Sequence, residues 1–205
     1  MDFLETGVPL LYICFMTVAQ PRITGVFNLQ PYVIDYSLPA MQVLKKLPDR
    51  FPAEVIDNKL FVSPLPNFSH ADICDRISDE LKAHVRAHNL GDVWATGLGV
   101  HLEPGKTLVG PDIIFVSKEN NLKREPRRGL FGVPDLLIEI LSSNRKYDLT
   151  TKKNLYERTG VKEIWYVDPF SKNAQGYLLE NGKYGSPFLT NAELHIRILS
   201  KTIKF

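Results

Sequence analysis

Cysteine is scarce in this chain of 205 residues, and its positive and negative charges nearly cancel. Cys14 and Cys74 are the only two cysteines and have no metal-type spacing, so neither a disulfide framework nor a cysteine-bound zinc site is expected. This scarcity favours a reducing compartment, and we expect a cytoplasmic protein. The formal net charge of +2 gives little overall attraction to nucleic acid, so any affinity must come from local patches.

Several recognisable signatures are also missing from the chain. It has no internal repeat, no low-complexity segment, and no helix-turn-helix, zinc-finger or RNA-binding signature. The glycines of TGLGVHLEPG lack the context of a loop that cradles phosphates. The composition is that of an ordinary globular protein, with 44% apolar and 23% charged residues. The function must therefore be read from individual polar residues and their spacing.

The first apolar run, residues 8–19, is too short to span a bilayer, which needs about 20 apolar residues. It has the length of a signal-peptide core, but the preceding MDFLETG carries two acids and no base, and no small-x-small cleavage site follows. We expect a strand, a docking segment or an extension there, with a signal peptide as the alternative, and no membrane association. The length suits one domain, which we place at residues 37–205, with residues 1–36 as an N-terminal extension.

Periodicity and turn residues predict alternating short strands and helices along the rest of the chain. Three helices are expected. The first covers residues 37–47 with Ser37 as its N-cap, and the second runs from Ser69 to before Gly91 with apolar residues at every fourth position. The third spans about residues 148–159 and is stopped by Gly160. Two hairpins are expected, one within residues 53–63 around Asp57-Asn58 and one within 176–185 around Asn181-Gly182. The other expected strands are residues 92–97, 99–104, 110–117, 133–142, 162–169 and 193–199. Residues 118–132 are expected to form a polar loop. This order predicts an α/β or α+β protein with a central mixed sheet flanked by helices.

Two of the expected strands carry carboxylates. Asp112 lies near the start of the strand at 110–117, and Asp135 and Glu139 lie on the strand at 133–142. Four residues along a strand span about 13 Å, so one metal ion cannot bind both Asp135 and Glu139. Asp112 must therefore be combined with one of them.

The register of the two strands decides which acid is the partner. An antiparallel pairing with Ser117 opposite about Pro134 would place Asp112 across from Glu139, on the same face of the sheet, and Asp135 at the far end. The connecting loop is too long to fix this register, and a slip of one residue would put the two acids on opposite faces. We expect the pair to be Asp112 and Glu139.

Glu139 lies within LLIEIL, where an isolated carboxylate is costly to bury. A divalent cation would offset that cost, and hard cations such as Mg²⁺ prefer carboxylate and carbonyl oxygens. The pattern predicts a Mg²⁺ site made of Asp112, Glu139 and the peptide carbonyl of Ile140, with Mn²⁺ as a substitute. The alternative is that Asp112 caps a turn and that Glu139 meets an arginine.

At a metal site that acts on a phosphate ester, a cation beside the attacking water and the phosphate stabilises the developing charge. Asp148, Lys152 and Tyr156 recur at four-residue spacing on the helix that follows, so they share one face. Lys153 is turned about 100° from Lys152. Lys152 is the candidate, and the alternative is an ordinary surface ion pair between Lys152 and Asp148.

The segments GPDIIFV, VPDLLIEILS and DLTTKKNLYERTGVKEIWYVDP resemble the Uma-type family of putative restriction endonucleases, within the PD-(D/E)xK nuclease superfamily. The similarity covers the chain from about residue 37 to its end. It implies a restriction-endonuclease-like fold and a Mg²⁺-dependent endonuclease that hydrolyses phosphodiester bonds in nucleic acid, with DNA as the expected substrate.

The resemblance also assigns roles to single residues. The superfamily carries an acid-x-lysine on the second strand, but here the lysine position is Leu141. The Uma-type family instead has a lysine on the following helix, which corresponds to Lys152. Asp112 and Glu139 are then the metal ligands and Lys152 positions the water or the phosphate.

Further candidates for the site are accessory. The family also places a histidine where His70 stands and an acid where Glu54 stands, and Tyr156 lies on the same helical face as Lys152. The alternatives without a functional role are that His70 is an exposed helix residue and that Glu54 is a surface charge. The remaining histidines form no convincing metal set, and Trp165 and Tyr166 are expected in the core.

The loop between the two acidic strands is rich in cations, and cations near an active site hold phosphates. The candidate phosphate contacts are Lys123, Arg124, Arg127 and Arg128. A solvated surface loop is the equally weighted alternative.

Two other functions stay open from the sequence. The displaced lysine would suit a catalytically silent nucleic-acid-binding or scaffold protein that retains the nuclease fold. A metal-dependent hydrolase of another phosphate ester is a weaker candidate. The number of copies is also open, although a homodimer would suit a duplex substrate.

Overall fold

The computed structural model describes residues 38–48, 51–62, 65–95, 97–142 and 145–205. The expectations for residues 1–36, including the apolar run at 8–19, and for Ser37 as a helix cap lie outside the described residues. No helix in the described part is both long and apolar enough to cross a membrane.

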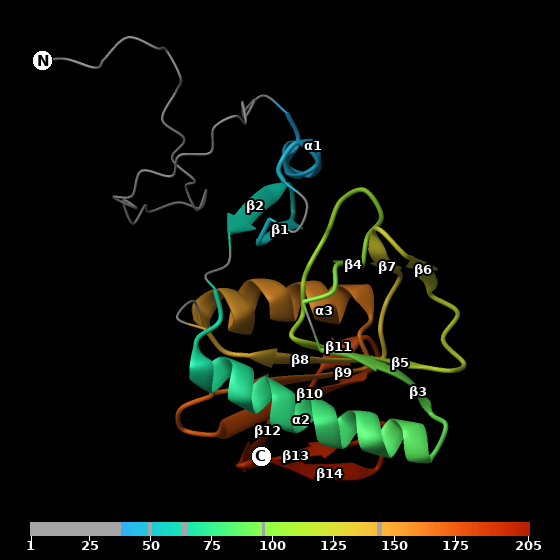
Figure 1. Ribbon diagram of the computed structural model, residues 1–205, viewed down its shortest axis with the longest axis vertical. Helices are drawn as coiled ribbons and strands as arrows, with labels where there is room; N and C mark the ends of the chain where they lie inside the picture. Colours follow the sequence, from blue (N-terminus) through green and yellow to red (C-terminus); the bar gives the residue numbers. More distant parts are fainter. Residues whose placement is uncertain (1–37, 49–50, 63–64, 96, 143–144) are drawn as a thin grey trace, which may run out of the picture.

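A seven-stranded mixed sheet forms the centre of the protein, in the order β11-β10-β9-β8-β5-β3 with β12 also paired to β10 (Figure 1). Its strands are β3 (Gly91–Trp94), β5 (Ile113–Ser117), β8 (Leu136–Ile140), β9 (Glu163–Val167), β10 (Asn173–Glu180), β11 (Lys183–Tyr184) and β12 (Phe188–Asn191). Strands β8 and β9 run parallel, and the other pairs in this sheet are antiparallel. The expected α/β class with a central mixed sheet is confirmed.

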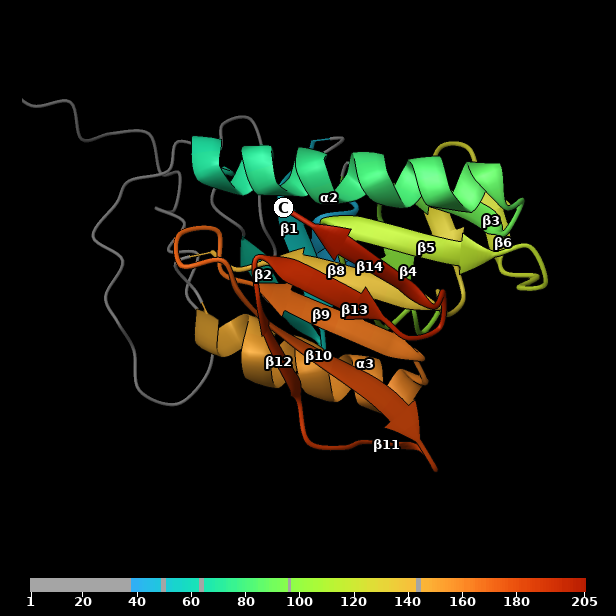
Figure 2. The same ribbon diagram turned by 90° about the horizontal axis from the view of Figure 1, so that it is seen from below.

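Helices cover both faces of this sheet (Figures 1 and 2). Helix α2 (Phe68–Ala87) and the hairpin β13–β14 (Glu193–Ile196 and Lys201–Lys204) pack on one face. The other face carries η1 (Tyr147–Lys152) and α3 (Lys153–Thr159). It also carries the hairpin β1–β2 (Ala53–Ile56 and Lys59–Val62) and a small sheet of β4 (Val100–His101), β7 (Gly129–Phe131) and β6 (Lys123–Glu125). The short helix α1 (Ala40–Leu44) packs against the β1–β2 hairpin.

The alternation of side chains along the central strands decides which residues meet the helices. Ile113 and Ile138 face α2, whereas Ile114 and Leu137 face α3. By the same alternation Glu139 points to the α3 side. A carboxylate is therefore directed into the apolar layer between β8 and the second helical run.

Helix α2 forms because Ile73, Ile77, Leu81 and Val85 repeat at every fourth residue and are all buried against the sheet. Its N-cap is Asn67, whose side-chain oxygen accepts the backbone N–H of His70 at 2.9 Å. The expectation of Ser69 as the cap is wrong by two residues, because Asn67 has the extended backbone that a capping residue needs.

The second helical run is continuous from η1 into α3 and ends at Gly160, which adopts a left-handed φ of 91°. Its first part is a π-helix, which the sequence did not predict and which is frequent at functional sites. Even so, Asp148, Lys152 and Tyr156 all lie on the buried side.

The expected hairpin turns are confirmed, since Asp57 and Asn58 have φ of 50° and 57°, and Asn181 and Gly182 have 51° and 78°. The expectation of an unstructured polar loop at 118–132 is wrong, because β6 and β7 form within it and β7 pairs in parallel with β4. Leu130 on β7 is only 3% exposed, so the stretch contains one apolar anchor among its charges. Strands β12 and β14 were not predicted.

Candidate active site

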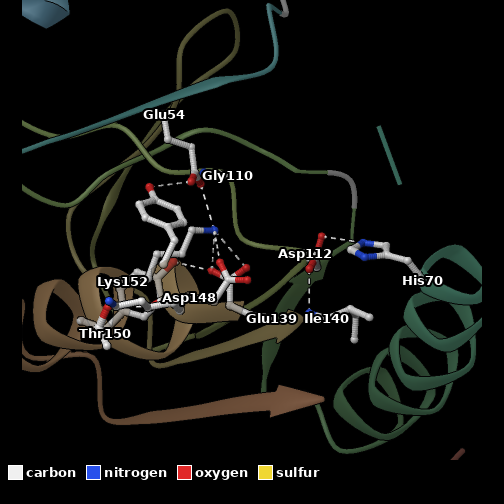
Figure 3. Close-up of polar contacts among 12 residues, drawn as sticks. Glu54, His70, Gly110, Asp112, Glu139, Ile140, Asp148, Thr150 and Lys152 are labelled. Atoms are coloured by element: carbon white, nitrogen blue, oxygen red, sulfur yellow. Dashed lines mark hydrogen bonds and ion pairs between the residues drawn. The ribbon is translucent and has the colours of Figure 1, made fainter. Parts of the chain in front are cut away.

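Asp112 and Glu139 are neighbours across the β5–β8 pair. The register joins Ile113 to Ile138, so one further step brings Asp112, the residue just before β5, opposite Glu139, as the sequence analysis expected. The carboxylate of Asp112 also accepts the backbone N–H of Ile140 through Oδ2 at 2.7 Å (Figure 3). Because this bond ties Asp112 to the backbone beside Glu139, the two acids are held together by the sheet itself.

Glu139 is buried, and hydrogen bonds reach both of its carboxylate oxygens. Its two carboxylate oxygens each accept a hydrogen bond from Nζ of Lys152 at 3.1 Å, and Oε1 also accepts the hydroxyl of Tyr156. The side chains of Glu139 and Lys152 are only 4% and 6% exposed. The shared face of the helical run thus places the lysine and the tyrosine directly over the strand acid.

Lys152 is surrounded by acids. Its ammonium lies 3.1 Å from Oε1 of Glu54 and 3.9 Å from Oδ1 of Asp148, in addition to Glu139. The ring of Tyr147 lies on another side, with its centroid 5.8 Å from Nζ. Burial lowers the pKa of Lys152, but the surrounding carboxylates outweigh it and raise the pKa well above its ordinary value. The lysine is therefore a fixed positive charge.

Glu54 on β1 is part of this cluster, although the sequence marked it only as an accessory candidate. Its Oε1 accepts the backbone N–H of Gly110 at 2.7 Å, and its Oε2 accepts the hydroxyl of Tyr147 at 3.0 Å. The residue is 5% exposed. Sequence reasoning missed Tyr147, since nothing in its spacing distinguishes it from any other residue of the helix.

His70, at the start of α2, reaches Asp112 from the other side of the sheet edge. Its Nε2 lies 3.0 Å from Oδ1 of Asp112 (Figure 3). This hydrogen bond raises the pKa of His70, while partial burial acts against it. Asp112 is also the most exposed acid of the cluster, with 21% of its side chain accessible.

The cluster carries more negative than positive charge. Burial, together with neighbouring acids and against the attraction of Lys152, raises the pKa of Glu139 to about 8 and that of Asp148 to about 6. Three acids, Glu54, Glu139 and Asp148, contact the one buried ammonium, and Asp112 lies opposite Glu139 as a fourth. A divalent cation would relieve this excess, and carboxylate oxygens are the ligands that Mg²⁺ prefers.

The donor set fits a partly hydrated ion better than a protein cage. In the described part of the chain, no three His, Cys, Asp or Glu side chains are arranged as a complete metal site. Asp112 and Glu139 supply two carboxylates, and Ile140 adds a backbone group beside them. Mg²⁺ commonly binds through one or two carboxylates and keeps several waters, so these residues suit it.

Other candidate residues lie away from this cluster. Asp135 accepts bonds from the backbone N–H of Ser117, the amide of Asn120 and Nζ of Lys162, and is therefore a structural acid. Trp165 and Tyr166 are fully buried, which confirms their place in the core.

The candidate phosphate contacts belong to the segment that carries β6 and β7. Arg124 pairs with Asp92, which lies opposite Val116, so it sits toward the end of β5 remote from Asp112. Lys123 and Arg128 pair with Glu125. Arg127 lies in the turn between the two strands. The structure does not bring these cations to Asp112 and Glu139, and their contact with phosphates stays a prediction.

Comparison with known proteins identifies the family and the fold. The family model Uma2, described as "Putative restriction endonuclease", matches residues 40–202. The chain is also similar to a solved structure, a putative nuclease belonging to DUF820 from Anabaena variabilis, with a TM-score of 0.64 and 19% sequence identity over 78% of this chain and 90% of that chain. No curated protein matches. The structural similarity confirms the expected restriction-endonuclease-like fold.

Proposed function

The chain belongs to the Uma2 family of putative restriction endonucleases, and on that premise we propose that it is a metal-dependent endonuclease that hydrolyses phosphodiester bonds in DNA. The observation that carries the proposal is the meeting of Asp112, Glu139 and Lys152 at one point on the sheet. Burying an acid and a lysine that bond each other, next to a second acid, costs desolvation free energy, so stability alone does not explain the arrangement. It is useful where a metal, a water and a phosphate must be held together.

Asp112, Glu139 and the carbonyl of Ile140 would hold Mg²⁺, with Mn²⁺ as a substitute. When bound, such an ion lowers the pKa of a water and stabilises negative charge on a phosphate. The carboxylates of Asp112 and Glu139 reach this position from two different strands. The sheet hydrogen bonds between those strands keep their separation fixed.

Lys152 would act from beneath this pair, beside Glu139. Its fixed positive charge, held by Glu139, can orient the attacking water or a phosphate oxygen and stabilise charge that develops on it. Glu54 holds the ammonium in place from the β1 side and accepts the hydroxyl of Tyr147. Tyr156 fixes the carboxylate of Glu139 in the same way.

His70 would hold Asp112 in the orientation for the metal. Its ring bonds Oδ1, while the N–H of Ile140 bonds Oδ2, so both oxygens of Asp112 have defined directions. His70, Glu54, Tyr147 and Tyr156 are therefore positioning residues in this proposal.

All of these groups come from one chain, so one copy is sufficient to cut one strand. A two-fold homodimer would cut both strands of a duplex. We assign the activity to residues 37–205, with residues 1–36 as an extension, and we place the enzyme in the cytoplasm because the scarcity of cysteine favours a reducing compartment.

The test is cleavage of supercoiled plasmid, single-stranded DNA and single-stranded RNA with Mg²⁺, with Mn²⁺ and with EDTA. Wild-type protein should cut DNA with either metal and not with EDTA. Glu139→Ala should abolish cleavage, whereas the matched Asp135→Asn should keep most of it, because Asp135 lies at the other end of β8 and contacts only structural partners.

Equal cleavage by wild-type and Glu139→Ala protein would overturn the assignment of the site. Calorimetric titration with Mn²⁺ separates this proposal from a silent scaffold. A folded wild-type protein that shows neither a metal response nor cleavage would favour the scaffold. Preferential cleavage of RNA would contradict DNA as the substrate.

A further inference from the structure

The candidate active site has buried groups and two partly exposed ones. The side chains of Glu139, Lys152 and Glu54 are 4%, 6% and 7% exposed. Those of Asp112 and His70 are 21% and 16% exposed. A substrate must therefore approach past Asp112 and His70, at the edge of the molecule where α2 begins.

Large hydrophobic side chains are exposed along this same edge. In the described part of the chain four such side chains are strongly exposed: Leu65, Phe68 and Phe170 lie near this edge, whereas Leu189 lies on β12. Phe68 is 85% exposed in the first turn of α2, two residues before His70, and Leu65 is 85% exposed just before that helix. Single exposed apolar residues need no explanation, but a group of them beside a site mouth indicates a binding surface.

Phe170 borders the site from the other side. It is 73% exposed in the turn between β9 and β10. Val167, three residues earlier, is the sheet partner of Ile140, so the turn lies just beyond the strand end that carries the site. Figures 1 and 2 both place this turn, the start of α2 and the start of η1 at the same edge of the molecule.

Both rings are carried by well-fixed backbone. Asn67 caps the turn that carries Phe68. Asp168 accepts the backbone N–H of Phe170 at 3.0 Å and pairs with Arg145 at 2.8 Å, which ties the β9–β10 turn to the start of the second helical run. Lys146, the next residue along, is exposed. The rim therefore combines two exposed aromatic rings on fixed backbone with the cations Arg145 and Lys146.

We propose that the substrate is a single strand of nucleic acid, or a strand with unstacked bases, whose bases stack on Phe68 and Phe170 while its phosphates pass Asp112. This inference rests on the proposed function and names its substrate class. An aromatic face binds any base, and each base–aromatic stack contributes about 1–3 kcal/mol, whereas a base in a duplex has its faces already covered. A narrow, flexible strand also reaches acids at this depth more easily than a rigid duplex does.

The experiment measures binding apart from cleavage. Fluorescence anisotropy in EDTA gives the affinity of full-length protein for a single-stranded DNA, a single-stranded RNA of the same sequence, and the corresponding DNA duplex. The wild type should bind a single strand more tightly than the duplex. Phe68→Ala and Phe170→Ala should each weaken single-strand binding about 10-fold, in line with one lost stack.

Matched variants separate stacking from a general loss of structure. Phe68→Tyr and Phe170→Tyr should restore single-strand binding, because the aromatic face is kept. Leu189→Ala should leave binding unchanged, since Leu189 is equally exposed, at 74%, but lies on β12 opposite Gln175. Thermal unfolding of each variant should match that of the wild type, because these side chains bury little surface.

The inference would be overturned if the two alanine variants bound a single strand as tightly as the wild type. It would also be overturned if Leu189→Ala weakened single-strand binding as much as they do. Tighter binding of the duplex, or no single-strand binding at all, would do the same. If stacking is found but no metal supports cleavage, the proposed nuclease function fails and the binding surface remains. If cleavage is found without stacking, only this inference fails.

Discussion

The ammonium of Lys152 donates to both carboxylate oxygens of Glu139, at 3.1 Å each, between a strand and a helix that shield the pair from solvent. The adjacent Lys153 points elsewhere, and its Nζ lies 4.7 Å from the centroid of the Tyr177 ring. Two neighbouring lysines thus have different surroundings, which makes them a matched pair for experiment.

Lys152→Ala should lower the cleavage rate by about 100-fold or more, the range typical of losing one electrostatic contact to a transition state. Lys153→Ala should change the rate little, because its ammonium faces an aromatic ring outside the cluster. Lys152→Arg should not restore full activity, since a planar guanidinium cannot replace a compact ammonium held by two carboxylates. Single-turnover cleavage at saturating Mg²⁺ is the measurement.

A control shows whether the Lys152→Ala site survives. Removing one positive charge leaves the surrounding acids more negative, so Mn²⁺ should bind this variant at least as tightly as the wild type. A collapsed site would instead lose metal binding. Damage from Lys153→Ala, or none from either change, would contradict the role given to Lys152.

Asp168 should contribute a pH-dependent part of the stability. Burial tends to raise its pKa, but bonds from the N–H groups of Phe170 and Ser171 and from Arg145 outweigh this and lower it to about 2. In the unfolded chain the pKa of Asp168 is about 3.9. The stabilising contribution of Asp168 is therefore fully present above about pH 3.9, and it is lost as the pH falls through the pKa of the folded state. Asp168→Asn should therefore destabilise the protein by about 1–2 kcal/mol at pH 6 and by almost nothing near pH 2.

Urea unfolding between pH 2 and pH 6 measures this difference. Asp72→Asn is a suitable control, because its partner Arg76 is exposed on the outer surface of α2 and such pairs contribute about 0–1 kcal/mol. A stability gap for Asp168→Asn that stays constant down to pH 2 would contradict the assignment.

The register expected for the strands of Asp112 and Glu139 is the one in the structure. The sequence favoured this register but did not fix it, because the connecting loop is long and both strands are apolar on both faces. The face of the helix was also predictable, since four-residue spacing places Asp148, Lys152 and Tyr156 together. What these residues do in the proposed reaction stays a prediction.

Long-range contacts could not be predicted in the same way. Glu54 bonds Tyr147, 93 residues later, and Gly110, 56 residues later, and no spacing in the sequence encodes either distance. The N-cap was placed at Ser69 because serine and asparagine are both good caps, and only the backbone conformation of Asn67 separates them. Strand β6 was missed because all three of its residues are charged, and β7 because it is only three residues long with one buried residue, Leu130.

A chain that begins at Asp35 should fold cooperatively. The described core starts at α1, where Ala40 and Val43 are buried, and the family match starts at residue 40. Thermal unfolding of this shortened chain and of the full chain should give single transitions at similar temperatures. An insoluble or molten shortened chain would show that residues before Asp35 contribute to the core.

Gly176 should not tolerate a side chain. It lies opposite Trp165 in the β9–β10 pair, and a Cβ built there would lie 2.5 Å from the indole ring. The indole is fully buried, and its Nε1 donates to Glu163 at 2.7 Å, so it cannot move aside without breaking that bond. Such overpacking costs about 1–3 kcal/mol, and Gly176→Ala should destabilise the protein by that amount.

Gly185→Ala provides the comparison, because no atom lies within 4 Å of its added Cβ and its backbone needs no left-handed conformation. Urea unfolding of both variants should show a clear loss for Gly176→Ala and almost none for Gly185→Ala. Double substitution with Trp165→Phe removes part of the indole that the new methyl group would strike. The penalty of Gly176→Ala should therefore be smaller in the Trp165→Phe background, and an unchanged penalty would show that contact with the indole is not its cause.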